Sequence, residues 1–171
     1  MPVNDVFLSD RPNQDLAGEL ALFGQFVGSW DVSVTSYKPD GSAITIPAEW
    51  HFAWALGGHA IQDVWIAPSR EARERDGSDG EWGTTIRFYD RDIGAWRSTW
   101  LGPRRHVVMP FIARRLEEEI VLEGSFEGGV TTRWIFSDIT AESFSWRAVE
   151  SRDGGNTWIV SQQMEARRQG A

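Results

Sequence analysis

The chain has 171 residues, 25% of them charged, a net charge of −8 at pH 7 and no cysteine. This length is typical of one domain with its own hydrophobic core, and without cysteine no disulfide, thiolate nucleophile or cysteine-ligated metal centre can form. The acidic balance argues against a surface that binds phosphate groups, so we expect no nucleic-acid partner.

Residues 1–14 lack the basic start and the continuous apolar run of a signal peptide. No part of the chain approaches the roughly 20 consecutive apolar residues of a membrane-spanning helix. We therefore expect a cytoplasmic protein without a membrane partner. In it, residues 1–14 form an extended arm and residues 168–171 a tail.

One helix is expected before a long series of strands. Apolar residues at helical spacing predict the helix over 15–27. After Gly28 the apolar residues alternate with polar ones, which is the period of a β-strand. A charged loop over 68–80 interrupts the series, with room for one helical turn. The ten expected strands are 30–37, 43–56, 59–67, 82–89, 95–101, 105–114, 117–125, 130–136, 143–151 and 158–166.

The mainly short turns between these strands predict a single all-β domain over residues 15–167. A meander of about ten antiparallel strands normally closes into a barrel, because closure removes the exposed edges. Ten tryptophans lie mostly in the strands, and each combines a broad apolar surface with one N–H donor. We therefore expect either a barrel filled by large flat side chains or a cavity that they line.

Three local patterns resemble one known family. They are Gly28-Ser29-Trp30 at the head of the first strand, the strand pair around Trp50–Trp54 and Gly57-Gly58, and Phe88-Tyr89-Asp90. Together they resemble the bacterial lipocalin-like proteins related to nitrobindins, within the calycin superfamily. The resemblance implies an up-and-down antiparallel barrel that the N-terminal helix closes at one end, with a small-molecule cavity at the other. Family members are variously binding proteins, haem proteins and cofactor-free enzymes.

A second motif covers Ser151–Trp158 and is similar to the Asp-box of sialidases and other propellers. A propeller repeats this box several times, whereas it occurs once here. We therefore interpret it as a turn in which Asp153 binds backbone N–H groups, Gly155 has a positive φ and Trp158 packs inward.

The Gly57-Gly58 turn predicts the register of the hairpin around it. If these two residues form the loop, Trp50 faces Trp65, Phe52 faces Asp63 and Trp54 faces Ile61. The face that we expect inside the barrel then carries Trp50, Phe52, Trp54, Ile61 and Trp65, with His59 and Asp63 among them. Its four aromatic residues are candidate ligand-binding residues.

This face supplies the candidate catalytic residues. Burial in an aromatic wall would raise the pKa of Asp63 and make it a general acid, with His59 as its partner in proton transfer. A slip of one residue would invert both faces and bring Glu49 and His51 inside, so His51 is the alternative. His59 also follows the turn, where a position at the wet rim is equally compatible with the sequence.

Further candidate ligand-binding residues lie in the middle of the chain and include Trp100 and His106. Arg104 and Arg105 follow Trp100 at a turn, where they would receive a ligand carboxylate, and His106 lies beside them. Arg87 and Tyr89 share one face of their strand and would form a polar part of the interior. Polar residues in a solvent-exposed turn or on the outer face of a strand would give the same sequence pattern, so an exposed position is the alternative for these residues.

We expect no metal and no cofactor, because the three histidines form no metal-binding motif. The hypothesis is a monomer or homodimer whose cavity binds a small apolar molecule, aromatic or polycyclic. It would transform this molecule by cofactor-independent acid–base chemistry, as a lyase, isomerase, cyclase or hydratase. The alternatives are a non-catalytic carrier or sensor, a haem-binding protein like the nitrobindins, and a barrel without a cavity.

Overall fold

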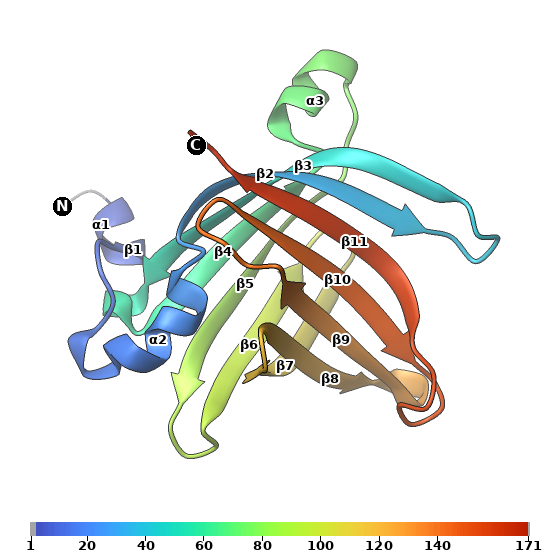
Figure 1. Ribbon diagram of the computed structural model, residues 1–171. Helices are drawn as coiled ribbons and strands as arrows, with labels where there is room; N and C mark the ends of the chain where they lie inside the picture. The colour runs from blue at the N-terminus through green and yellow to red at the C-terminus, as the bar shows by residue number, and fades with distance from the viewer. Residues whose placement is uncertain (1–2, 171) are drawn as a thin grey trace.

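The computed structural model describes residues 3–170 and contains an antiparallel β-barrel (Figure 1). Within these residues the strands are β1 (Leu8–Ser9), β2 (Gly28–Tyr37), β3 (Ala43–Ala55), β4 (Ala60–Ala67), β5 (Glu81–Asp90), β6 (Ala95–Gly102), β7 (Val107–Leu116), β8 (Glu119–Phe126), β9 (Val130–Ser137), β10 (Ser143–Ser151) and β11 (Ile159–Arg168). The helices are α1 (Asn4–Phe7), α2 (Ala17–Gly24) and α3 (Arg70–Asp76). Single 3₁₀ turns lie at η1 (Gln14–Leu16), η2 (Leu56–Gly58) and η3 (Glu127–Gly129).

Consecutive strands from β2 to β11 pair antiparallel, and β11 returns to pair with β2. This pairing closes a barrel of ten strands, which confirms the expected up-and-down fold. The small strand β1 pairs with the end of β3 at Leu8 and Ser9, beyond the point where β2 begins. Among residues 3–170, no helix has the length and apolar character needed to cross a membrane.

The register of the β3–β4 hairpin is as predicted. Trp50 pairs with Trp65, Phe52 with Asp63 and Trp54 with Ile61. The loop is longer than two residues, since η2 and His59 form the turn and strand pairing begins at Ala60. The expected start of the strand at His59 is therefore wrong by one residue.

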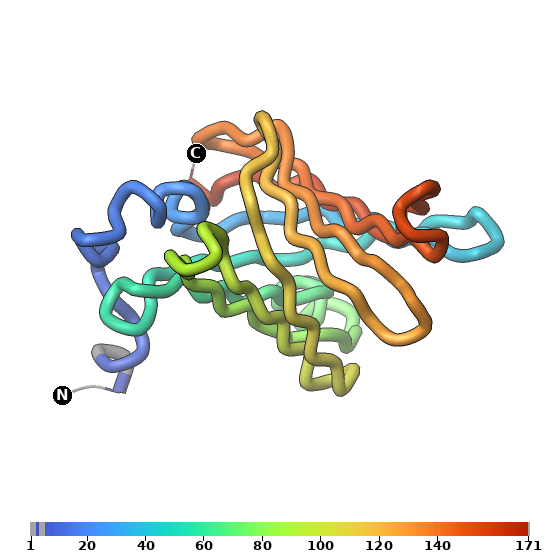
Figure 2. Tube along the Cα trace, turned by 90° about the horizontal axis from the view of Figure 1, so that it is seen from below, coloured from blue at the N-terminus to red at the C-terminus, as the bar shows by residue number. Residues whose placement is uncertain are grey.

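Helix α2 lies across one end of the barrel, opposite the β2–β3 hairpin (Figures 1 and 2). Its residues Leu20 and Phe23 are fully buried against the strands. The helix is shorter than the predicted 15–27 and ends at Gly24. A Cβ at Gly24 would lie 2.7 Å from the ring of Trp54, so the close approach of helix and strand requires glycine here.

Regular secondary structure extends further toward both ends of the described residues than expected. The segment 1–14, predicted as an extended arm, contains α1 and β1, while residues 1–2 lie outside the described part. The expected tail at 168–171 begins later, because β11 extends through Arg168.

The Asp-box forms a turn, as interpreted. Asp153 accepts hydrogen bonds from the backbone N–H of Thr157 at 2.9 Å and its hydroxyl at 2.6 Å, which lowers the pKa of Asp153 to about 2. Gly155 has φ +91°. The expectation that Trp158 packs inward is wrong. Its ring lies on the outside of the barrel, with Arg133 stacked 4.3 Å from the ring centroid.

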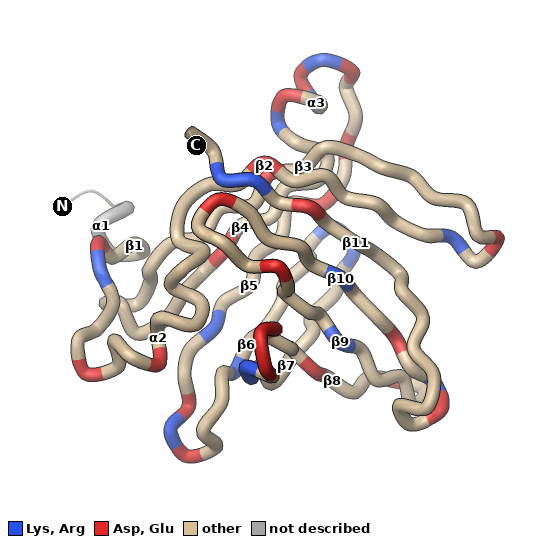
Figure 3. The backbone as a smooth tube through the Cα atoms, viewed as in Figure 1, with Lys and Arg blue, Asp and Glu red and all other residues tan. Residues whose placement is uncertain are grey.

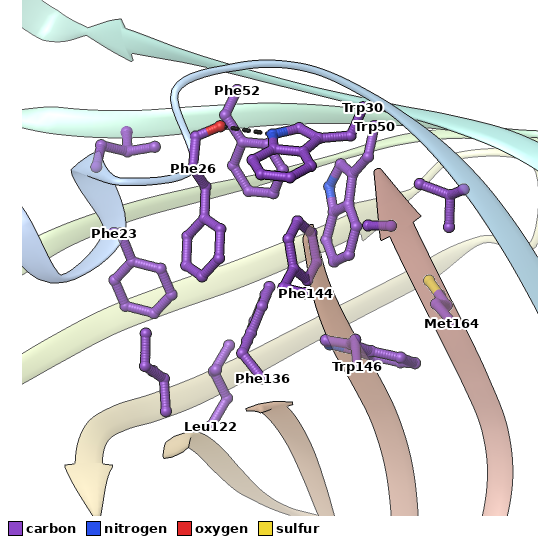
Figure 4. Packing of buried hydrophobic residues seen from close by; sticks show 14 of the residues in the cluster. Phe23, Phe26, Trp30, Trp50, Phe52, Leu122, Phe136, Phe144, Trp146 and Met164 are labelled. Carbon is purple, nitrogen blue, oxygen red and sulfur yellow. Dashed lines mark hydrogen bonds between the residues drawn. The ribbon is translucent and has the colours of Figure 1, made fainter. Parts of the chain in front are cut away.

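Phenylalanine and tryptophan side chains fill the barrel at the end that α2 closes. Figure 4 shows this cluster, with the indole N–H of Trp30 donating to the carbonyl oxygen of Phe26 at 2.8 Å. The rings of Phe26 and Phe144 meet edge to face at 4.9 Å between centroids, and those of Trp30 and Phe144 at 4.7 Å. This half of the barrel is therefore a packed core, and free interior space is expected only toward the other end.

Candidate functional site

A cavity of about 210 Å³ occupies the half of the barrel that α2 does not close. Most of its wall is apolar. The lining residues are Trp50, Trp65, Glu81, Thr85, Trp100, Arg105, Val107, Met109, Trp134, Trp146, Gln162 and Met164. The expectation of a tryptophan-lined cavity therefore agrees with the geometry better than the alternative of a completely filled barrel.

Five of the lining residues form a series of ring contacts, which we call the tryptophan belt: in order, Trp65, Trp100, Trp134, Trp146 and Trp50. Along the belt the ring centroids of consecutive members lie 5.9, 6.1, 5.5 and 6.3 Å apart, all edge to face. Trp50 and Trp65, the two ends of this series, are register partners on the neighbouring strands β3 and β4. Aromatic faces on all sides suit a flat ligand.

Strand periodicity and one glycine together position the belt. Side chains along a strand point alternately into and out of the barrel. Each of these tryptophans occupies an inward-pointing position. Gly83 pairs with Trp65, and a Cβ at Gly83 would collide with the Trp100 ring. The absence of a side chain here leaves the space in which these two indoles meet.

Polar groups are few, and one of them organises the rim. Glu81 is 4% exposed. Its carboxylate accepts hydrogen bonds from the backbone N–H groups of Trp82, Arg104 and Arg105 at 3.2–3.3 Å. These contacts attach the β6–β7 turn to the start of β5. Gln162 donates to the hydroxyl of Ser36 at 3.0 Å.

Asp63 lies inside the barrel, as expected, but its partner is Arg87. Both side chains are buried in the wall, and Asp63 also accepts the backbone N–H of Thr85 at 3.1 Å. Burial raises the pKa of Asp63, outweighing the charge of Arg87 and the hydrogen bonds that lower it. Burial also lowers the pKa of Arg87, whose guanidinium lies over the rings of Phe23 and Phe52 at 4.8 and 5.6 Å.

None of the three histidines lines the cavity. His59 is exposed in the hairpin turn, where its Nδ1 lies 3.2 Å from the carbonyl oxygen of Leu56. His106 is exposed in the β6–β7 turn. His51 is on the outer face of β3, next to Glu49. The predicted His59–Asp63 pair therefore does not form, because β4 begins only after His59.

His51 belongs to a polar cluster that holds α3 against the outside of the barrel. Its ring nitrogens lie 2.8 Å from Ser29 Oγ and 3.0 Å from Glu49 Oε2. Glu49 also accepts the backbone N–H of Arg70 at 2.6 Å and its guanidinium at 2.7 and 2.9 Å. Burial opposes the charge on Glu49, but these hydrogen bonds prevail and lower its pKa to about 2. Figure 3 shows acidic and basic residues alternating along α3.

Several residues predicted to bind the ligand lie outside the cavity. Phe52 belongs to the packed core, and Trp54 contacts Gly24 at the closed end. Tyr89 packs against Trp96, with 6.0 Å between the ring centroids. Arg104 is exposed and pairs with Asp79, whereas its neighbour Arg105 lines the cavity. Trp50, Trp65, Trp100 and Arg105 are the predicted ligand-binding residues that line the cavity.

Sequence reasoning did not single out the β9–β11 side of the cavity, which consists of Trp134, Trp146, Gln162 and Met164. The alternation puts Trp134 and Phe136 on the same face of β9, and it puts Phe144 and Trp146 on the same face of β10. It does not say which face is inside. The usable signal was the tryptophans themselves. β9 and β10 each contain one, Trp134 and Trp146, and the face that carries the indole was the better candidate for the inside of the barrel.

The haem alternative does not fit the described residues. An axial histidine would have to project into the cavity, and all three histidines lie outside it. Among residues 3–170, no group of three or more histidine, aspartate or glutamate side chains is arranged to hold a metal ion.

The closed ten-strand meander with a helix at one end is a lipocalin-like barrel. Solved structures with this fold include an S-type phycobiliprotein lyase from Guillardia theta, with a TM-score of 0.59 and 12% identity over 88% of this chain and 92% of that one. Another is Rv2717c from M. tuberculosis, with a TM-score of 0.57 and 16% identity over 91% of this chain and 99% of that one. The sequence matches no family model and no curated protein. At these identities the likeness concerns the fold.

Proposed function

We propose that the protein binds a small planar aromatic molecule inside the tryptophan belt. The observation that carries this proposal is the belt itself, five indoles around one cavity at the open end of the barrel. Indole faces gain affinity from apolar area and from edge-to-face or stacked contacts with a flat ring. Binding of this kind requires no titratable group in the wall.

The size of the cavity limits the part of the ligand that it encloses. An engineered apolar cavity of about 150 Å³ binds benzene. The 210 Å³ here therefore suits one or two fused rings. A larger polycyclic molecule would have to extend through the rim near Arg105 and Val107.

Calorimetric titration with a two-ring probe such as 2-acetylnaphthalene tests the proposal. Met109 lines the cavity, and a Met109→Trp substitution would fill part of it. Val108 is the adjacent residue, is 65% exposed and lies on the outer face, so that Val108→Trp is the matched control. We expect the first variant to weaken binding at least about tenfold and the second to leave it within about twofold. Equal binding by both variants, with thermal unfolding unchanged, would place the probe outside the cavity.

Acid–base catalysis is a second candidate, favoured by the buried carboxyl group of Asp63; because Asp63 does not itself line the cavity, this candidate requires the wall beside Thr85 to open toward a substrate. A carboxyl group whose pKa burial raises is suited to donate a proton. A solved neighbour with this fold is named as a lyase, which makes a lyase reaction one form of this candidate. In this hypothesis Asp63 acts without His59 or His51.

Product analysis separates the two candidates. Each probe that binds is incubated with the protein and examined by mass spectrometry and chromatography for mass and isomer composition. Unchanged probes support a carrier or sensor. Conversion that His59→Ala retains and Asp63→Asn abolishes supports proton transfer by Asp63, provided that Asp63→Asn still binds the probe.

A further inference from the structure

One charged side chain at the rim of the cavity has no partner. Asp79 forms ion pairs with Arg73 and Arg104. The carboxylate of Glu81 accepts three backbone N–H groups, one of which belongs to Arg105. The guanidinium of Arg105 has neither a hydrogen bond nor an ion pair within residues 3–170, although the chain has 25 acidic residues against 17 basic ones. The charge of Arg105 is therefore available to a bound molecule.

Arg105 differs from an ordinary surface arginine in two respects. It lines the cavity, and among the described residues that do so it is the only cation. Its backbone N–H donates to the buried carboxylate of Glu81 at 3.3 Å, which fixes the β6–β7 turn to the start of β5. A cation whose backbone is already held in place loses less conformational freedom when it binds an anion.

The indole of Trp100 extends from the tryptophan belt to this turn. Its ring packs edge to face against Trp65 in the belt. Its Nε1 lies near the end of β6, because a hypothetical Cβ at Gly102 would be 3.0 Å from that nitrogen and 3.1 Å from Glu81 Oε2. The turn that carries Arg105 begins directly after Gly102. A ring held in the belt therefore needs only a short substituent to reach this turn.

The rim is also the part of the cavity where a charge costs least. The deeper wall consists mainly of indole rings, among which burial of an ionised group is costly. Thr85 and Gln162 have neutral side chains that can face either a donor or an acceptor, so they select no charge. At the rim an anion keeps part of its hydration and meets a guanidinium, which binds carboxylates through two parallel hydrogen bonds. The charge of Glu81 opposes an anion there, but its three backbone donors already stabilise it.

We infer that the tryptophan belt binds aromatic carboxylates, with the ring among the indoles and the carboxylate at the rim against the guanidinium of Arg105. One or two fused rings, with the acid group on the ring or on a short side chain, match the cavity of about 210 Å³. Arg105 then determines the specificity for an anionic over a neutral aromatic ligand. This inference rests on the proposed function and specifies its ligand class.

The test compares 2-naphthoate with 2-naphthamide, which has the same ring and nearly the same shape but no charge. Each is titrated by calorimetry into the wild type, Arg105→Gln and Arg104→Gln. The last is the matched control, because Arg104 is the adjacent arginine, pairs with Asp79 and lies outside the lining of the cavity. Thermal unfolding of the three proteins checks that the substitutions leave the fold intact.

We expect Arg105→Gln to weaken 2-naphthoate at least about fivefold, as for an ion pair with good geometry at a partly exposed site. It should change 2-naphthamide by less than about twofold, since a neutral amide gains little from the charge. Arg104→Gln should change neither probe by more than about twofold, as is usual for a surface substitution. The wild type should bind the naphthoate at least as tightly as the amide.

Salt gives a second readout. Because salt screens exposed charges, raising NaCl from about 0.02 M to about 0.3 M should weaken 2-naphthoate relative to 2-naphthamide in the wild type. In Arg105→Gln this weakening should be absent.

Three results would each overturn the proposed ligand class. They are equal effects of Arg105→Gln and Arg104→Gln on 2-naphthoate, equal losses of the two probes in Arg105→Gln, and tighter binding of the amide than of the acid by the wild type. A wild type whose preference between the probes does not change with salt would count against it equally. Those results would leave aromatic binding intact, whereas failure of both probes to bind would contradict the proposed function itself.

Discussion

Arg168 joins the end of the last strand to the start of the barrel. Its guanidinium donates to the carbonyl oxygens of Val27, Gln25 and Ala141 at 2.6–2.9 Å and lies 4.1 Å from the Trp30 ring centroid. Gly28 accommodates it, with φ +130° and a hypothetical Cβ 2.7 Å from Arg168 Nη1.

Substitution of Arg168 by alanine should therefore lower the free energy of unfolding by about 2–4 kcal/mol, from lost charged hydrogen bonds and one cation–π contact. Urea denaturation measures this change. The neighbouring Arg167 is exposed, and Arg167→Ala should stay within about 0.5 kcal/mol of the wild type. Equal effects of the two substitutions would show that Arg168 does not stabilise the barrel closure.

The buried pair Asp63–Arg87 gives a second prediction at this scale. Asp63→Ala leaves the guanidinium buried without its carboxylate, which should cost about 3–5 kcal/mol of stability. The double substitution Asp63→Leu/Arg87→Met removes both charges and should recover most of that loss. Thermal and chemical denaturation of the single and double variants would decide this. If the double variant is as unstable as the single one, an unpaired charge is not the cause.

At the scale of elements, Glu49 connects the barrel to α3. The pKa of this carboxyl group is about 2 in the folded protein, against an ordinary value of 4.5. Because the folded-state pKa is lowered, the stabilisation is fully present above about pH 4.5 and is lost as the pH falls toward 2.

Glu49→Gln should consequently lower stability by about 1–3 kcal/mol at pH 7. The difference from the wild type should shrink steadily between pH 4.5 and pH 2. Unfolding measured across this range tests the prediction, with Glu71→Gln in the first turn of α3 as the control. A difference that does not change with pH would mean that the charge of Glu49 has no part in holding α3.

At the scale of the whole molecule, the barrel follows from short-range patterns in the sequence. Alternation predicts the strands, and Gly57-Gly58 predicts the β3–β4 register even though the loop includes Leu56 and His59. The site depends on contacts between residues that are far apart in the sequence. Arg87 reaches Asp63 because β4 and β5 are neighbours in the closed sheet.

Placement of the histidines required the structure for a related reason. The sequence pattern distinguishes two faces of β3 but does not identify the inner one, so His51 and Asp63 remained alternatives. The position of His59 depended on a loop length that differed by one residue at each side. The tryptophan belt follows from packing across five strands, about which local periodicity carries no information.

A crystal structure of the protein with 2-acetylnaphthalene is the most direct test of the central claim, that the tryptophan belt is a binding site. The account predicts the naphthalene rings inside the cavity, among the five indoles of the belt. Rings found only on the outer surface, for example beside the exposed Trp82 and Val108, would contradict it. An interior without the probe at saturating concentration would contradict it equally.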